Sequence, residues 1–254
     1  MRFTFIAASF CLLSVTPLTS TQTERKVTRL ADGVYGIEHA AHGGGNTTVI
    51  LGERQVFVVD TCFSPSAARE DIASIRQWTD KPVSFVLNTH FHNDHNLGNR
   101  VYMDAFPNLT IIAHAETRKD MDRFGPGSEI REVKTLESLR QMLASGKAPS
   151  GVALTGEDTK QVKEAIAGQE AIMEQLHNVK FQTATLTFEH GFSVDLGNRE
   201  VRVQFLGRGN TAGDAVVYLP RERIVAAGDL VVHPIPYIYD GYIGENWVTP
   251  CGAE

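Results

Sequence analysis

Positive charge is scarce in this sequence. Lysines and arginines number 24 against 30 aspartates and glutamates, which gives a formal net charge of −6 over 254 residues. No stripe of basic residues runs along the chain, and this absence argues against a nucleic-acid partner. The deficit of positive charge also gives no attraction to an anionic membrane surface. The charge balance therefore disfavours nucleic-acid processing and membrane-surface binding.

Long apolar runs are also scarce, and the most apparent one lies at the N-terminus. Arg2 is the only charged residue among the first twenty, residues 3–15 are mostly apolar, and residues 16–20 form a more polar segment where cleavage would occur. This order predicts a secretory signal peptide over residues 1–20, and hence a periplasmic or secreted protein. The run is too short to span a bilayer, so we expect no membrane contact after cleavage. A buried N-terminal helix is the alternative interpretation.

Cysteine is rare as well, with only Cys11, Cys62 and Cys251. Export would remove Cys11 with the signal peptide. The remaining two cysteines would be able to pair in an oxidising compartment, although nothing in the sequence places them close together. An inert, half-buried thiol at Cys62, which follows an apolar strand, is the alternative.

The remainder, residues 27–254, is predicted to form one domain of alternating strands and helices, with no internal repeat. Ser64 before Pro65 predicts a helix start. Two further helices are expected around residues 133–143 and 157–177, with packing against the core as the favoured interpretation and a cover over a site as the alternative. The expected strands are 27–34, 34–38, 46–51, 55–60, 83–87, 111–114, 185–188, 192–196, 201–206, 215–219 and 224–227.

The segment 90–95, His-Phe-His-Asn-Asp-His, carries three imidazoles and one carboxylate directly after the expected strand 83–87. Neutral imidazole and carboxylate are the usual nitrogen and oxygen ligands of zinc. A surface cluster of polar residues after a strand is the alternative interpretation. Few structural needs place so many ligand types at the end of a buried strand, so the segment predicts a metal site.

Two other segments end apolar strands in a similar way. Residues 206–214 form a glycine-rich turn after one strand, and Asp229 follows another. An isolated aspartate at a strand end is usually a turn or cap residue. The order and spacing of these segments relative to residues 90–95 favour a ligand role for Asp229.

In this order the segments resemble the metallo-β-lactamase superfamily of metallohydrolases. The resemblance covers about residues 27–229 and rests on the strand end at 58–61, the signature at 89–95, the glycine-rich turn at 207–214 and Gly228-Asp229. It implies an α/β fold of the αββα type, a four-layer sandwich of two mixed sheets flanked by helices. The site would lie along one edge of the sandwich.

The resemblance also implies a set of ligands for one or two zinc ions. His90 and His92 would belong to the first site, Asp94 and His95 to the second, and Asp229 would bridge the two.

Further roles follow from the same resemblance. Asp94 would act in catalysis as well, by orienting the attacking hydroxide and accepting its proton. Asp60 would orient a ligand, and the loop 43–46 would border the substrate, although a plain flexible turn is an equal alternative.

Two departures from the family pattern stand out. Asn210 occupies the position where the family usually has a third histidine of the first site, and an amide oxygen is a poorer zinc ligand than imidazole. The family also supplies a later histidine, but His233 is the single one after Asp229. Residues 237–254 do not resemble the expected outer helices. We expect the chain to be truncated, or its reading frame altered, soon after Asp229, which would leave the second sheet partly uncovered.

The chemistry expected of such a site is hydrolysis of a small-molecule substrate. Zinc lowers the pKa of bound water from about 15.7 to about 7, and the resulting hydroxide would attack an ester, lactone or lactam carbonyl. The alternative is a non-catalytic or degraded family member that binds metal weakly, as Asn210 suggests. No pattern in the sequence predicts an oligomeric state.

Overall fold

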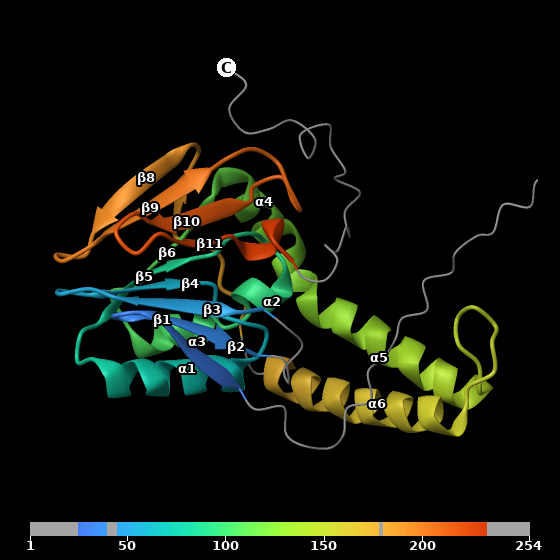
Figure 1. Ribbon diagram of the computed structural model, residues 1–254. Helices are drawn as coiled ribbons and strands as arrows, with labels where there is room; N and C mark the ends of the chain where they lie inside the picture. Colours follow the sequence, from blue (N-terminus) through green and yellow to red (C-terminus); the bar gives the residue numbers. More distant parts are fainter. Residues whose placement is uncertain (1–24, 40–44, 178–179, 233–254) are drawn as a thin grey trace, which may run out of the picture.

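Two β-sheets stacked face to face form the body of the protein (Figure 1). The computed structural model describes residues 25–39, 45–177 and 180–232. The larger sheet has seven strands in sequence order: β1 (Lys26–Ala31), β2 (Val34–Glu38), β3 (Thr47–Leu51), β4 (Val56–Val59), β5 (Val83–Leu87), β6 (Thr110–His114) and β7 (Leu186–Phe188). The smaller sheet has the order β11 (Ile224–Ala226), β10 (Ala215–Leu219), β9 (Glu200–Phe205) and β8 (Gly191–Asp195).

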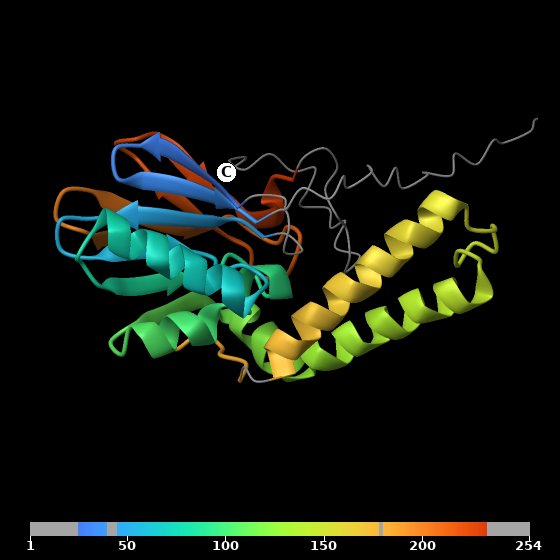
Figure 2. The same ribbon diagram turned by 90° about the horizontal axis from the view of Figure 1, so that it is seen from below.

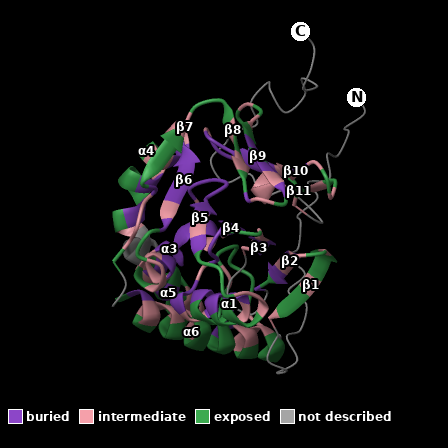
Figure 3. Ribbon diagram, turned by 90° about the vertical axis from the view of Figure 1, so that its left-hand side faces the viewer, coloured by how far each residue is buried: buried purple, intermediate pink, exposed green. Residues whose placement is uncertain are grey.

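The larger sheet is mixed, and its centre is its most buried part. Strands β1 to β4 pair antiparallel, whereas β4 to β7 pair parallel. The parallel strands β4 and β6 are almost continuous apolar runs, as expected for strands covered on both faces (Figure 3). The smaller sheet is antiparallel throughout its described pairings, so the expectation of two mixed sheets is wrong for this one.

One face of the larger sheet is covered by helices α1 (Pro65–Trp78) and α3 (Asn99–Ala105). Ser64 caps α1 by accepting a hydrogen bond from the backbone N–H of Ala67, and Pro65 occupies the first turn, as predicted. The apolar face of α1, which includes Ile72 and Ile75, packs against the sheet. The opposite face of the sheet packs against the smaller sheet through a second apolar core, which includes Phe57, Leu87 and Val203.

The two long helices do not pack on the core as predicted. Helices α5 (Ser128–Ser145) and α6 (Gly156–His177) lie against each other as a hairpin that extends away from the sandwich (Figure 2). Among the described apolar side chains of this hairpin, only Leu136, Val162 and Leu176 are buried. The hairpin contacts the body near the end of α6, where the Gln175 side chain accepts a hydrogen bond from the backbone N–H of Ser66. The favoured interpretation of core packing is therefore wrong for most of their length.

The remaining helices connect these layers. They are α2 (Asn93–Asn96), α4 (Ala115–Phe124) and two 3-10 turns, η2 (Gly125–Gly127) and η3 (Gly228–Leu230).

The outer face of the smaller sheet is open to solvent at β9, where the exposed Arg202 and Gln204 alternate with the buried Val201 and Val203. Residues 237–254, which do not resemble the outer helices of the family, lie outside the described ranges, as do the predicted signal peptide, Cys11 and Cys251. Within the described residues, every helix is too short or too polar to cross a membrane.

Candidate metal centre

The candidate site lies at the edge of the larger sheet where the parallel strands β4, β5 and β6 end. Val59, Leu87 and Ile112 are paired in register, so β4 and β5 end at the same level and β6 continues two residues further. Asp60 follows β4 and His90 follows β5, and both side chains therefore reach the same edge. Such edges are where layered α/β proteins gather functional residues from several strands.

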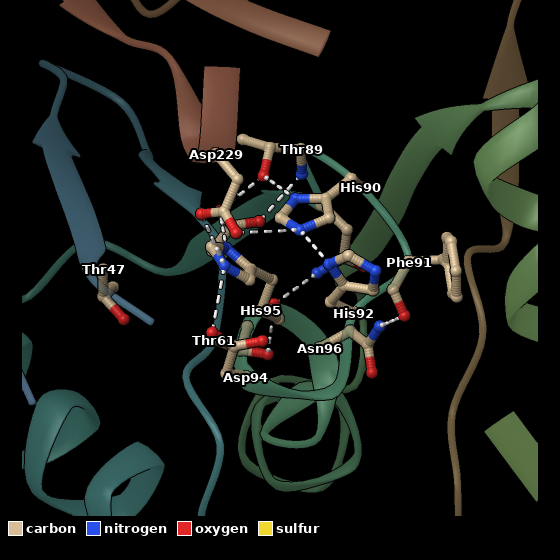
Figure 4. Close-up of polar contacts among 12 residues, drawn as sticks. Thr47, Thr61, Thr89, His90, Phe91, His92, Asp94, His95, Asn96 and Asp229 are labelled. Carbon is tan, nitrogen blue, oxygen red and sulfur yellow. Dashed lines mark hydrogen bonds and ion pairs between the residues drawn. The ribbon is translucent and has the colours of Figure 1, made fainter. Parts of the chain in front are cut away.

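A sharp connection brings the histidines of the segment 90–95 together. His92 begins the short helix α2 with extended backbone angles, and the side-chain amide of Asn96 donates to the carbonyl of Phe91 at 2.7 Å. The ring centroid of His90 lies 4.7 Å from that of His92 and 4.1 Å from that of His95 (Figure 4). Local folding of the segment thus converts sequence proximity into a convergent set of side chains.

The first group of ligand atoms comes from His90, His92 and Asp229. Nε2 of His90 and Nδ1 of His92 lie 3.0 Å apart, and Oδ2 of Asp229 lies 3.6 Å from Nε2 of His90. One ligand atom from each of the three residues falls within 4.8 Å of the others. Two ligands held tetrahedrally at 2.0–2.1 Å from one zinc ion are about 3.3–3.4 Å apart, so these separations fit a shared cation.

The second group consists of Asp94, His95 and the other oxygen of Asp229. Nε2 of His95 lies 3.3 Å from Oδ2 of Asp94 and 3.2 Å from Oδ1 of Asp229. This buried nitrogen makes no hydrogen bond of acceptable geometry to any described residue. A buried polar atom that faces two carboxylates without such a bond fits a cation among them. Each Asp229 oxygen thus faces one group, as a bridging carboxylate would.

Asn210 lies beside the first group, on the turn between β9 and β10. Its Nδ2 is 3.4 Å from Nδ1 of His92, and the side chain is buried. The turn is held by Asp214, whose Oδ2 accepts from the backbone N–H of Thr211 at 2.6 Å and from its hydroxyl at 3.0 Å. An amide group therefore lies next to His92, and exchange of its oxygen and nitrogen positions would present the oxygen to His92 instead.

Asp60 supports the site from the adjacent strand. Its Oδ2 lies 2.8 Å from Nδ1 of His95 and accepts from the hydroxyl of Thr89, while its Oδ1 accepts from the backbone N–H of Thr89, both at 2.8 Å. A carboxylate on Nδ1 favours the tautomer in which Nε2 of His95 has its lone pair free for a cation. The hydroxyl of Thr89 also lies 3.1 Å from Nδ1 of His90.

Electrostatics around His95 are strongly coupled in the metal-free chain. Burial lowers the pKa of His95, but the charge of Asp60 and the close carboxylates of Asp229 and Asp94 outweigh it and raise the pKa well above its ordinary value. Burial raises the pKa of Asp229, yet its close contacts with His90 and His95 bring the pKa far below its usual range. The pKa of Asp94 is likewise lowered, because His95 outweighs the effect of burial. The site therefore holds ionised carboxylates that attract a cation.

A layer of buried amides, which no motif in the sequence predicts, lies beneath the histidines. The Asn88 side chain donates to the carbonyl of His95 at 3.0 Å and to Oδ1 of Asn99 at 3.1 Å, and Asn99 donates back to Asn88 at 2.8 Å. Thr61 donates to the same Asn99 oxygen at 2.9 Å. Only the position of Asn88 next to the signature pointed to this role in advance.

Other expected site residues lie partly or wholly outside the described ranges. His233 and residues 43–44 of the glycine-rich loop fall there. Gly45 is described, and it lies against the backbone of Asp94 so closely that an added Cβ would come within 1.7 Å of the Asp94 carbonyl oxygen. The end of this loop therefore contacts the candidate centre.

The architecture and the site define a metallohydrolase-like αββα chain, and a family comparison agrees. Residues 41–250 match the metallo-beta-lactamase superfamily. The chain belongs to this superfamily, whose members are metal-dependent hydrolases.

One curated relative is the linear primary-alkylsulfatase of a Pseudomonas species. The two sequences are 26% identical over 182 residues, which cover 70% of this chain and 32% of the alkylsulfatase. The chain thus spans about a third of that relative's length.

Solved structures share the fold at low sequence identity. A metallo-beta-lactamase from Pontibacter korlensis has a TM-score of 0.53 and 16% identity, with 80% of this chain and 71% of that chain covered. The metallo-beta-lactamase IND-7 has a TM-score of 0.51 and 15% identity, with coverages of 80% and 70%.

Proposed function

We propose that this chain is a zinc-dependent hydrolase. His90 and His92 would hold one ion beside Asn210, Asp94 and His95 would hold a second, and Asp229 would bridge them. The observation that carries the proposal is the placement of Asp229. Its two oxygens lie 3.6 Å from His90 Nε2 and 3.2 Å from His95 Nε2, one toward each histidine group.

The described side chains suit the two tasks that hydrolysis requires. Zinc, when bound, supplies a water of lowered pKa and polarises the substrate oxygen. Asp94 is the candidate proton acceptor, because its lowered pKa keeps it ionised at neutral pH and its carboxylate stays partly exposed, at 32%. Asp60 and Thr89 fix the rings of His95 and His90, and preorganisation of this kind reduces the reorganisation needed during reaction.

A partly exposed aromatic ring, Phe124, packs on the buried Phe91 next to His92 and favours a substrate with an apolar part. Phe91 stacks on Phe124 with ring centroids 5.4 Å apart, and it also touches His92 at 4.7 Å. Phe124 is partly exposed, and the guanidinium of Arg123 lies 4.8 Å from its ring centroid. A carbonyl substrate of the ester, lactone or lactam type is the first candidate.

A second candidate substrate is an alkyl sulfate, by similarity to the alkylsulfatase relative. The partly exposed ring of Phe124, with the cationic group of Arg123 next to it, suits an amphiphilic anion.

Asn210 supports the competing proposal of a weakly binding, non-catalytic family member, because amide groups are poorer zinc ligands than imidazole. Metal stoichiometry separates the two proposals. Zinc that is retained after dialysis and lost in His92→Ala would support the hydrolase, and a zinc content that His92→Ala does not change would support the non-catalytic member. An Asn210→His variant should bind zinc more tightly than the unaltered chain if this residue completes the first group.

The direct test is hydrolysis of a chromogenic β-lactam, a lactone, an aryl ester and a linear alkyl sulfate by the zinc-loaded full-length chain. We expect turnover of at least one class, lost on chelation and in His92→Ala. His177→Ala, a matched change on the exposed end of α6, should leave turnover intact. Activity that survives both exhaustive chelation and His92→Ala would overturn the proposal.

A further inference from the structure

A second cluster of metal-ligating side chains lies on the other side of the larger sheet. His39 follows β2, Cys62 follows β4, and Asp71 lies on α1, facing the sheet. All three are almost completely buried, at 1%, 0% and 0% exposure. Cys62 belongs to the apolar core between the sheet and the helices, and the three residues form a ligand group distinct from that of His90, His92 and Asp229.

The three side chains are close enough to share one ion. One ligand atom from each lies within 4.8 Å of the other two. Nε2 of His39 is 3.0 Å from Oδ2 of Asp71. Nitrogen and oxygen ligands of a tetrahedral zinc ion lie about 3.3 Å apart, and a sulfur ligand lies about 3.6 Å from either. The Cys62 thiol would therefore need to move by only about 1 Å for one cation to bind all three side chains.

Two buried polar atoms in this part of the core lack hydrogen-bond partners among the described residues. They are Nδ1 of His39 and the hydroxyl oxygen of Tyr102. Tyr102 belongs to the same buried core as Cys62, and burial, followed by the charge of Asp71, raises the pKa of its hydroxyl well above the ordinary value. Buried polar groups without partners are rare, and an ion or water at the site is one of their ordinary explanations.

Asp71 is already positioned as a ligand. Nε of Arg25 donates to Oδ1 of Asp71 at 2.8 Å, which leaves Oδ2 directed at His39. Carboxylate ligands of metal ions are commonly held by such an outer hydrogen bond. Without a metal, burial and the charge of Asp71 raise the pKa of the Cys62 thiol well above its ordinary value, so binding of a divalent cation would release a proton from Cys62.

We propose that His39, Cys62 and Asp71 form a second, structural metal site for a thiophilic divalent cation such as zinc. The donor set of thiolate, imidazole and carboxylate is one that zinc accepts and that magnesium or calcium does not favour. The competing assignment is a metal-free hydrogen-bonded core in which Asp71 ties Arg25 and His39 to α1.

The site would brace the chain segment that supports the candidate metal centre. Asp60 and Cys62 are two residues apart, and both have left-handed backbone conformations, with φ of 59° and 61°. Asp60 holds His95, while the backbone N–H of Thr61 between them donates to the His95 carbonyl at 3.0 Å. An ion on Cys62 would fix the far end of this segment.

Cobalt(II) gives a test that depends on the thiolate. The full-length chain with Cys11→Ser and Cys251→Ser retains Cys62 as its single thiol. Because the site is buried, this protein is refolded in the presence of cobalt(II) and a reductant without thiols. We expect a near-ultraviolet thiolate-to-cobalt charge-transfer band that saturates at one ion per chain. The centre at the sheet edge has only nitrogen and oxygen ligands and contributes nothing to this band.

Matched variants complete the experiment. Cys62→Ser should abolish the band and lower the bound cobalt by one ion per chain, and Asp71→Asn should weaken it. His92→Ala should keep the band, which separates this proposal from the proposed hydrolase. Refolding is checked by circular dichroism. A folded chain with intact Cys62 that binds cobalt without the band would overturn the proposal and establish the metal-free core.

Discussion

The support that Asp60 gives to His95 leads to a quantitative prediction for Asp60→Asn. The two side chains have nearly the same size, and asparagine tolerates the positive φ of 59° at this position. The substitution replaces one carboxylate oxygen by an NH₂ group. Oδ1 and Oδ2 together accept three hydrogen bonds at 2.8 Å, from Thr89 twice and from His95 once, so one donor must then face another donor.

The expected effect on metal binding follows from the tautomer of His95. With an NH₂ group near Nδ1, this atom becomes an acceptor and the ring proton moves to Nε2, the nitrogen that faces Asp94 and Asp229. Loss of such an outer hydrogen bond typically weakens metal affinity about 10–100-fold, or about 1.4–2.7 kcal/mol. The metal-free chain should also lose about 1–3 kcal/mol of folding free energy, because a buried donor is left without a partner.

Zinc affinity measured by competition with a chromophoric chelator tests this reasoning, with urea unfolding of the metal-free chain alongside. Asp104→Asn is the control, because Asp104 forms an exposed ion pair with Arg100 on α3 and should change stability by less than about 1 kcal/mol. Asp60→Asn with a zinc affinity within about twofold of the unaltered chain would refute the role assigned to Asp60, since about tenfold is the least expected.

Three further predictions concern glycines and pH. In Gly98→Ala, the new Cβ would lie 2.0 Å from the Thr61 carbonyl oxygen, so urea unfolding should show that the free energy of unfolding falls by about 1–3 kcal/mol. The control Gly127→Ala has open space around the new Cβ and should leave the free energy of unfolding almost unchanged. Gly45→Ala should weaken zinc binding by displacing the Asp94 backbone, whereas Gly146→Ala, which shares only the positive φ, should leave zinc affinity unchanged. His95 has a folded pKa above its ordinary value of 6.5, so its stabilisation of the chelated chain is complete below that pH and is lost as pH rises through the folded pKa. Thermal unfolding midpoints of the chelated chain that stay constant between about pH 6 and about pH 9 would contradict this last prediction.

Local chemistry made much of the fold predictable. Ser64 and Pro65 start α1 as expected, and Gly146 ends α5 in the left-handed conformation that glycine favours. The convergence at the sheet edge also followed from the sequence, because parallel strands that end in register deliver Asp60 and His90 to one place.

The parts that could not be predicted depend on contacts between distant segments. Leu139 and Leu143 lie on one face of α5, and such a face can pack either against a neighbouring helix or against the domain core. Helical periodicity alone does not show which of the two partners it has. The paired amides of Asn88 and Asn99 are similar: asparagine is common in turns, and only the folded chain shows both buried beneath His95.

The two left-handed residues beside the site differ in what holds them, and this difference bears on Cys62. A non-glycine residue in this conformation costs about 1–2 kcal/mol and persists only where its surroundings enforce it. For Asp60, three hydrogen bonds at 2.8 Å provide that enforcement. For Cys62, the thiol donates a weak hydrogen bond of 3.7 Å to the carbonyl of Ser64. A bond from Cys62 to an ion shared with His39 and Asp71 would supply the missing constraint, so the backbone and the donor set point to the same buried site.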